Sequence, residues 1–382
     1  MYINASRVFK VKMTTNFKQL AVTGVQSLQP YQPGKPIDEL AREFGLNEED
    51  IIKLASNENP LGPSPKVTAV IQESLDELTR YPDGAGFELK QALSQKFGIQ
   101  KEQITLGNGS SDILDFICRV FVRPGENIVT SQHAFAIYSI VATMVGAQCI
   151  QVPAVNFAHD LDAMAEAINE KTRVVFVTNP NNPTGTWINK SELVEFLNKV
   201  PSNVLVLLDE AYFEYVQDPN YPDGLTLLND YPNLVVARTF SKAYGLASLR
   251  VGYGVSNPEV ADLLNRVRPP FNVNSLALVA AKAALADDDY VQRSIEENSK
   301  GMKQLEAAFD QLNIEFIPSA GNFIAFKVPS KITAADLFQQ LLAKGVIVRP
   351  IAGYEMPDYL RVSIGTETEN QGFIDALTQV LA

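Results

Sequence analysis

The chain has 382 residues, 46% of them hydrophobic and 20% charged, a composition typical of folded globular proteins of two or three domains. Its 32 Lys and Arg against 44 Asp and Glu give a formal net charge of -12, which argues against a nucleic-acid-binding surface. Two histidines are too few for a multi-histidine metal site, and two cysteines without Cys-x-x-Cys spacing indicate buried thiols in a reducing cytoplasm.

The N-terminal part is predicted to be an arm. The first dozen residues are basic but lack an apolar run and a cleavage site, and no later run is long enough for a membrane helix, so we expect a cytoplasmic protein without a membrane segment. Met13 is an alternative start to Met1. Residues 17–65 carry clustered Pro and Gly, with a short helix expected over 37–44 and a strand over 51–55.

From residue 66 onward, helical and strand patterns alternate, which predicts an α/β fold with a mostly parallel, mixed sheet and helices on both faces. Strands are expected over 104–106, 127–130, 148–152, 174–177, 204–208 and 234–238, and around Gly252 and Gly254. Helices are expected over 66–78, 87–97, 113–120, 136–145, 161–168, 190–197 and 258–267.

Arg268-Pro269-Pro270 marks a predicted domain boundary. Helices over 276–312, strands over 323–328, 346–349 and 360–364, and a closing helix over 369–381 predict a smaller α+β domain. We therefore expect residues 1–65 to form an arm and part of the small domain, 66–268 the large domain that binds any cofactor, and 269–382 the small C-terminal domain.

Polar groups follow several predicted strands, and the carboxyl ends of parallel strands meet at one edge of a sheet. Gly107 and Gly109 allow close backbone approach before a helix N-terminus, so this turn is a candidate phosphate site, although such turns also cap helices. Its predicted ligands are Ser110, Ser111, Thr239, Ser241 and Arg250.

Two ionisable residues at this edge suit a carbonyl cofactor with a basic ring. Asp209 ends an aliphatic strand, so its carboxylate needs a cation or donor such as a pyridinium nitrogen, although a helix cap or an arginine pair is the simpler alternative. Lys242 follows another strand, and a lysine whose pKa is lowered by its neighbours forms a Schiff base with such a cofactor. An ordinary surface lysine is the alternative.

Four motifs match a known family in order and position: Ser-Asn-Glu-Asn-Pro (56–60), Asn-Pro-Asn-Asn-Pro-Thr-Gly (179–185), Asp-Glu-Ala-Tyr (209–212) and Arg-Thr-Phe-Ser-Lys-Ala-Tyr-Gly-Leu-Ala-Ser-Leu-Arg-Val-Gly-Tyr (238–253). Through them the chain resembles the fold-type I aminotransferases that depend on pyridoxal 5'-phosphate, and within that family most closely the histidinol-phosphate aminotransferases. The resemblance covers nearly everything after residue 17.

The resemblance implies a role for each matching position. Lys242 is similar to the lysine that carries the cofactor as a Schiff base and moves the substrate proton, and Asp209 to the carboxylate that pairs with the ring nitrogen. Asn182 and Tyr212 resemble the pair that contacts the phenolic oxygen. Phe135 takes the place of the aromatic residue that stacks on the ring, where many relatives have Tyr.

The resemblance also implies a homodimer that acts on small amino and oxo substrates. Tyr81 is similar to a tyrosine that reaches the phosphate from the neighbouring subunit. Arg361 resembles the arginine that binds the substrate's anionic end, with Arg349 and Tyr31 as further contacts, although arginines at strand ends are more often solvated. The alternatives are an aromatic amino-acid aminotransferase, a decarboxylase of the threonine-phosphate type, and a transcription regulator, for which a DNA-binding module is lacking.

Overall fold

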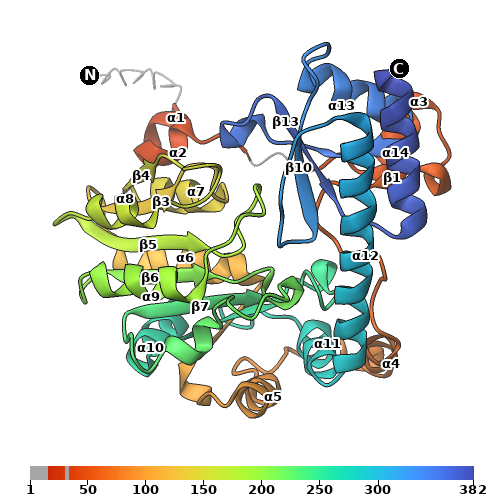
Figure 1. Cartoon of the computed structure of the whole chain (residues 1–382). Helices are drawn as coiled ribbons and strands as arrows, with labels where there is room; N and C mark the ends of the chain where they lie inside the picture. Colours follow the sequence, from red (N-terminus) through yellow and green to blue (C-terminus); the bar gives the residue numbers. More distant parts are fainter. Residues whose placement is uncertain (1–15, 31–33) are drawn as a thin grey trace, which may run out of the picture.

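The computed structural model describes residues 16–30 and 34–382 of the protein (Figure 1). The predictions for Met13 and Tyr31 lie outside these residues. Among the helices of the described residues, none combines the length and the apolar character needed to cross a membrane.

A seven-stranded sheet forms the centre of the larger part of the molecule, with the strand order β2-β8-β7-β6-β5-β3-β4. Its strands are β2 (Ile104–Gly107), β3 (Asn127–Ser131), β4 (Gln148–Val152), β5 (Thr172–Thr178), β6 (Leu205–Asp209), β7 (Leu234–Thr239) and β8 (Gly252–Ser256). The pairs from β7 to β4 are parallel, whereas β8 runs antiparallel to both β7 and β2. Because β2 therefore points the same way as β7, the predicted mixed, mostly parallel sheet is confirmed, with its carboxyl ends at one edge.

Helices cover both faces of this sheet, as predicted (Figure 1). The helices are α4 (Pro65–Glu73), α5 (Phe87–Phe97), α6 (Ser110–Phe121), α7 (Ile137–Met144), α8 (Leu161–Glu166), α9 (Lys190–Lys199), α10 (Pro258–Val267) and α11 (Ser275–Leu285). One apolar core joins α4, α5, α8, α9 and α11 to one face, and a second joins α6, α7 and α10 to the other. The strands are buried on both faces, which is why they read as continuous aliphatic runs.

A second, smaller part contains a four-stranded antiparallel sheet in the order β12-β13-β10-β9 and a two-stranded parallel sheet of β1 and β11. Its strands are β1 (Ile52–Lys53), β9 (Phe316–Ile317), β10 (Phe323–Lys327), β11 (Val346–Ile347), β12 (Arg349–Pro350) and β13 (Tyr359–Ser363). Three helices pack on these strands: α12 (Asp288–Leu312), α13 (Ala334–Ala343) and α14 (Glu367–Leu381). The β9 strand was not predicted, because two residues show no periodicity.

The segment predicted as an arm contacts both parts. Its helices α1 (Phe17–Leu20) and α2 (Thr23–Ser27) lie beside α7, on the edge of the large sheet (Figure 1). Helix α3 (Ile37–Phe44) instead buries Leu40 in an apolar cluster with Ile347 of β11. The three-part domain division itself stays a prediction.

Two predicted helices end earlier than expected. The predicted helix over 66–78 ends as α4 at Glu73, where the Ser74 side chain caps a carbonyl by donating to the Val70 oxygen at 2.7 Å, and a 3-10 turn over Leu75–Glu77 follows. The predicted helix over 161–168 ends as α8 at Glu166. In both cases the apolar spacing continues past the last helical hydrogen bond, so a prediction from the spacing alone extends beyond the end of the helix.

Candidate active site

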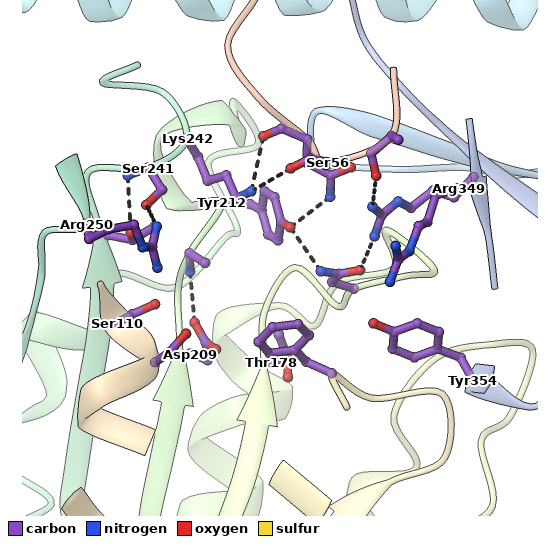
Figure 2. A pocket seen from close by; sticks show the side chains of 18 residues that line it. Ser56, Ser110, Thr178, Asp209, Tyr212, Ser241, Lys242, Arg250, Arg349 and Tyr354 are labelled. Atoms are coloured by element: carbon purple, nitrogen blue, oxygen red, sulfur yellow. Dashed lines mark hydrogen bonds between the residues drawn. The ribbon is translucent and has the colours of Figure 1, made fainter. Parts of the chain in front are cut away.

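A cavity of about 180 Å³ lies where the carboxyl edge of the large sheet meets the small antiparallel sheet (Figure 2). Nearly all the predicted site residues line it, although they come from separate strands and loops: Ser110, Ser111, Phe135, Asn182, Asp209, Tyr212, Thr239, Ser241, Lys242, Arg250, Arg349 and Arg361. Tyr81 lies elsewhere on this chain, with 82% of its surface exposed. Tyr31 is outside the described residues.

Lys242 sits in the loop after β7 and points into the cavity (Figure 2). Its Nζ atom donates to the backbone oxygens of Ser56 and Asn57, both at 3.1 Å. Burial, reinforced by the positive charge of Arg361, lowers the pKa of this amine to about 7. A substantial fraction of Lys242 is therefore neutral and nucleophilic at physiological pH.

Asp209 ends β6 with 3% of its surface exposed. Its Oδ2 accepts a hydrogen bond from the Tyr138 hydroxyl at 2.9 Å, and its Oδ1 accepts from the Ala211 backbone N–H at 3.2 Å. Burial raises the pKa of this carboxyl to about 6, against the smaller opposing effect of these hydrogen bonds. Such a carboxylate favours a positively charged partner in the cavity.

Tyr212 is the centre of a hydrogen-bond network that joins both parts of the molecule (Figure 2). Its hydroxyl oxygen accepts from Asn57 Nδ2 at 2.9 Å and from Asn182 Nδ2 at 3.1 Å. Asn182 Oδ1 in turn accepts from Arg361 Nη1 at 2.6 Å. Burial raises the pKa of Tyr212 to about 12, so its hydroxyl stays protonated at neutral pH.

The predicted phosphate site lies at the N-terminus of α6. Gly109 has a φ of 81° there, which other residues rarely adopt, and a Cβ atom at this position would lie 2.6 Å from Arg250 Nη2 and push the guanidinium away. Arg250 Nη1 also donates to Ser241 Oγ at 3.3 Å. Backbone N–H groups, hydroxyls and a guanidinium thus converge at one end of the cavity, as an anion requires.

Two arginines line the opposite end of the cavity, on neighbouring strands of the small sheet. Arg349 of β12 and Arg361 of β13 are directly opposite each other in the antiparallel register. Arg361 is 5% exposed, and its Nη2 donates to the Ala55 oxygen at 2.9 Å. Paired guanidinium groups at a partly closed cavity suit a doubly charged anion.

Six further lining residues were assigned no role from the sequence: Ala55, Ser56, Asn57, Thr178, Ala211 and Tyr354. Tyr138 does not line the cavity but borders the site through its hydrogen bond to Asp209. Asn57 lies in a quoted motif, which could have identified it. Tyr138 lies in the first turn of α7, three residues after Phe135, which precedes the helix. Thr178 and Tyr354 carry no local signal.

These features fit pyridoxal 5'-phosphate, the cofactor that the sequence resemblance implies. The anion site at Gly109 and Arg250 matches a phosphate, the desolvated carboxylate of Asp209 matches a protonated ring nitrogen, and the neutral amine of Lys242 matches an aldehyde. Among the described residues, no cluster of His, Cys, Asp and Glu suits a metal ion.

Comparison with known proteins gives concordant matches. A family model described as aminotransferase class I and II matches residues 49–377. Histidinol-phosphate aminotransferase 2 from Pseudomonas fluorescens is 59% identical over 370 residues, which are 97% of this chain and 100% of that protein. A relative of the same name from Pseudomonas aeruginosa is 58% identical over 96% of this chain and 99% of its own length.

Two solved structures give the same picture. The crystal structure of histidinol-phosphate aminotransferase from Sinorhizobium meliloti, in complex with pyridoxal-5'-phosphate, matches with a TM-score of 0.85 at 29% identity, over 94% of this chain and 96% of that one. L-threonine-O-3-phosphate decarboxylase from Porphyromonas gingivalis matches with a TM-score of 0.77 at 25% identity, over 87% and 99%.

Proposed function

Because the chain belongs to the family of class I and II aminotransferases, it is a transaminase of the fold-type I architecture, and we propose that its substrates are histidinol phosphate and glutamate. The amino group would pass between glutamate/2-oxoglutarate and histidinol phosphate/imidazole-acetol phosphate, with pyridoxal 5'-phosphate as the cofactor. The observation that carries this proposal is the pair of arginines, Arg349 and Arg361, opposite the predicted cofactor phosphate site.

When bound, pyridoxal phosphate supplies an electron-withdrawing ring that stabilises negative charge at the substrate's Cα. Asp209 holds the proton on the ring nitrogen through its buried carboxylate. Lys242 Nζ, about half of which is neutral near pH 7, would hold the cofactor and, once the substrate has displaced it, would accept the proton that leaves the substrate's Cα. Tyr212 and Asn182, which are hydrogen-bonded to each other, would contact the phenolic oxygen of the bound cofactor.

The arginine pair explains how one cavity accepts two different anionic substrates. Arg361, held by Asn182 and Ala55, is preoriented for any anionic end, whether carboxylate or phosphate. Arg349 adds a second positive charge, which matters more for a phosphate of nearly two negative charges than for a carboxylate of one.

The substrate proposal is tested by single-turnover rates of the wild-type protein with histidinol phosphate, glutamate, phenylalanine and tyrosine. We expect histidinol phosphate to react with a higher kcat/KM than either aromatic amino acid. A clear preference for phenylalanine or tyrosine contradicts the proposal and favours an aromatic amino-acid aminotransferase. Release of carbon dioxide from a phosphorylated amino acid would instead identify a decarboxylase.

Arg349→Gln refines the same test. We expect it to lower kcat/KM for histidinol phosphate by about tenfold or more, the factor that one charge-assisted hydrogen bond contributes, and to change the glutamate half-reaction less. Lys327→Gln is the matched control, because Lys327 lies on the same small sheet but is exposed and paired with Glu315. Equal losses for both substrates would contradict a phosphate-specific role for Arg349.

We further propose that the active form is a cytoplasmic homodimer in which Tyr81 completes the partner's site. Tyr81 is 82% exposed and stacks on Phe271, itself 45% exposed, with ring centroids 4.7 Å apart. Phe87 is also 53% exposed. An exposed aromatic cluster of this kind is typical of a protein interface.

A further inference from the structure

Tyr138 is a fully buried tyrosine behind the cavity, on the first turn of α7. Its hydroxyl lies 2.9 Å from Asp209 Oδ2 and 2.7 Å from Thr178 Oγ1. An ionised carboxylate can only accept, so Tyr138 donates its one hydrogen to Asp209. The Thr178 hydroxyl must then donate to Tyr138, which gives the chain Thr178 to Tyr138 to Asp209.

The register of the large sheet creates this chain of hydroxyls. Thr178 and Asp209 are the last residues of β5 and β6 and are paired directly across the two parallel strands. Helix α7 packs on one face of the large sheet, and this packing brings the Tyr138 hydroxyl within hydrogen-bond distance of both Thr178 and Asp209. The His159 ring, through Nε2, donates to the Thr178 backbone oxygen at 2.8 Å and fixes the end of β5.

We propose that Tyr138 and Thr178 are positioning residues that hold the Asp209 carboxylate in place and ionised against the ring nitrogen of the bound cofactor. The inference rests on the proposed function, because it concerns the same cofactor site.

The charges around Asp209 explain why hydroxyls are needed. Tyr138 from α7 and Lys242 from the chain after β7 lower the pKa of Asp209. The charge of Asp209 in turn helps to raise the pKa of Tyr138 and of Tyr212 and Tyr221 from the chain after β6. Burial keeps the pKa of these tyrosines well above neutrality, and the pKa of Lys242 is lowered to about 7. Hydrogen bonds therefore supply most of the stabilisation that a full cation would provide elsewhere.

The Tyr138 ring is also supported by two aromatic contacts. It stacks on Phe176 with centroids 4.6 Å apart and an angle of 16°, and it meets Phe135 edge-on at 6.0 Å and 88°. Phe135 lines the cavity where the cofactor ring is expected. Because phenylalanine at position 138 would keep these ring contacts, Tyr138→Phe removes only the hydroxyl.

The test follows the protonation of the cofactor itself, with holoenzyme reconstituted from pyridoxal phosphate labelled with ¹⁵N in the ring. In wild type we expect a nitrogen resonance in the pyridinium range. Tyr138→Phe makes Asp209 more basic, so the shared proton moves toward the carboxyl and the resonance shifts toward neutral pyridine. We expect the protonation ratio to change by about tenfold to a hundredfold, the contribution of one hydrogen bond to a charged group.

Thr178 variants test the order of the hydrogen-bond chain from Thr178 through Tyr138 to Asp209. Thr178→Val should shift the resonance in the same direction as Tyr138→Phe, but by less, and Thr178→Ser should give the wild-type resonance. The double variant Tyr138→Phe with Thr178→Val should match Tyr138→Phe alone, because Thr178 acts through Tyr138. Tyr231→Phe is the control, since the Tyr231 hydroxyl bonds Asn198 at 2.9 Å on the surface. If Tyr138→Phe does not fold, the Thr178 variants still show whether the hydroxyls act on Asp209.

An unchanged pyridinium resonance in both Tyr138→Phe and Thr178→Val, with cofactor still bound, overturns the inference. That result differs from failure of the proposed cofactor site, in which the wild-type protein itself would not bind pyridoxal phosphate. It differs also from failure of the substrate proposal, which appears in the substrate preference and not in the nitrogen resonance. Equal shifts with Thr178→Val and Thr178→Ser would also contradict the proposed hydrogen-bond chain, because Thr178→Val removes the hydroxyl and Thr178→Ser keeps it.

Discussion

At the scale of single residues, one physical cause prepares both ionisable groups of the site. Burial raises the pKa of Asp209 to about 6 and lowers the pKa of Lys242 to about 7, because low polarity disfavours the charged form of either group. Each group is thereby brought close to neutral pH, where it can exchange protons with a bound ligand. The Arg361 charge adds to the effect on Lys242.

Replacing the amine tests the role proposed for Lys242. We expect Lys242→Ala to abolish turnover while the protein still binds pyridoxal phosphate noncovalently, because the phosphate and ring contacts remain. The measurement is turnover together with the cofactor's absorbance before and after borohydride reduction. Lys171→Ala, at an exposed lysine, is the control. Normal activity and covalent labelling in Lys242→Ala would show that another residue binds the cofactor.

The raised pKa of Asp209 also makes a prediction about stability in the cofactor-free protein. The folded state binds a proton more tightly than the unfolded state, whose carboxyl has a pKa near 3.8. Its contribution to stability is therefore complete below about pH 4 and is lost as pH rises through 6. Between pH 5 and 7, the unfolding free energy of wild type should fall by about 1 kcal/mol relative to that of Asp209→Asn, since the lowered pKa of Lys242 acts in both proteins.

Urea unfolding of the two cofactor-free proteins at several pH values measures this difference. Asp230→Asn, at an exposed carboxyl, should follow wild type. Parallel pH curves for wild type and Asp209→Asn would show that the carboxyl titrates normally. In the holoenzyme, Asp209→Asn should keep the fold but lose most activity, since a neutral amide cannot hold the ring proton.

At the scale of elements, the site is assembled from strand ends and one helix N-terminus. Strands β5, β6 and β7 deliver Thr178, Asp209 and the Lys242 loop to a common edge, because parallel neighbours end together. Most of these elements were predictable, since buried parallel strands are aliphatic and helices repeat at 3.6 residues. The ends of the elements were less predictable, because α4 and α8 stop before their apolar patterns do.

The turn before α6 supplies an element-scale prediction. Gly109→Ala should weaken pyridoxal phosphate binding by about tenfold or more, because the added Cβ displaces Arg250 from the anion site. Gly98→Ala is the matched control: Gly98 has a similar positive φ of 67°, but open space surrounds its Cβ position. Both variants should lose about 1 kcal/mol of stability from backbone strain. Equal cofactor affinity in the two proteins would exclude the proposed role of Gly109.

At the scale of the whole molecule, the cavity exists only because the large and small sheets face each other. Arg361 belongs to β13, yet it reaches Asn182 in the loop after β5 and the Ala55 oxygen near β1. The Lys242 amine likewise bonds carbonyls at positions 56 and 57. The site is therefore held together by contacts between segments that are distant in the sequence.

The proposed dimer predicts complementation between two defective variants. Lys242→Ala lacks the reactive amine, and Tyr81→Ala should bind cofactor weakly. If Tyr81 acts on the partner's site, a mixed dimer contains one intact site, so equal mixing should restore about one quarter of wild-type activity when subunits pair at random. Activity is measured after unfolding and joint refolding. No recovery, despite mixed dimers shown by mass spectrometry, would place Tyr81 outside the partner's site.

By itself, the sequence determined the α/β class, the alternation of elements and the family, because these depend on local periodicity and on motifs of adjacent residues. It also indicated Lys242 and Asp209 as chemically suited residues. Only the tertiary structure decided that Tyr138 bonds both Asp209 and Thr178, and that Arg349 lies opposite Arg361. The reason is physical: strand register and the packing of one helix on the sheet bring these groups together, and neither is encoded by the residues adjacent to them.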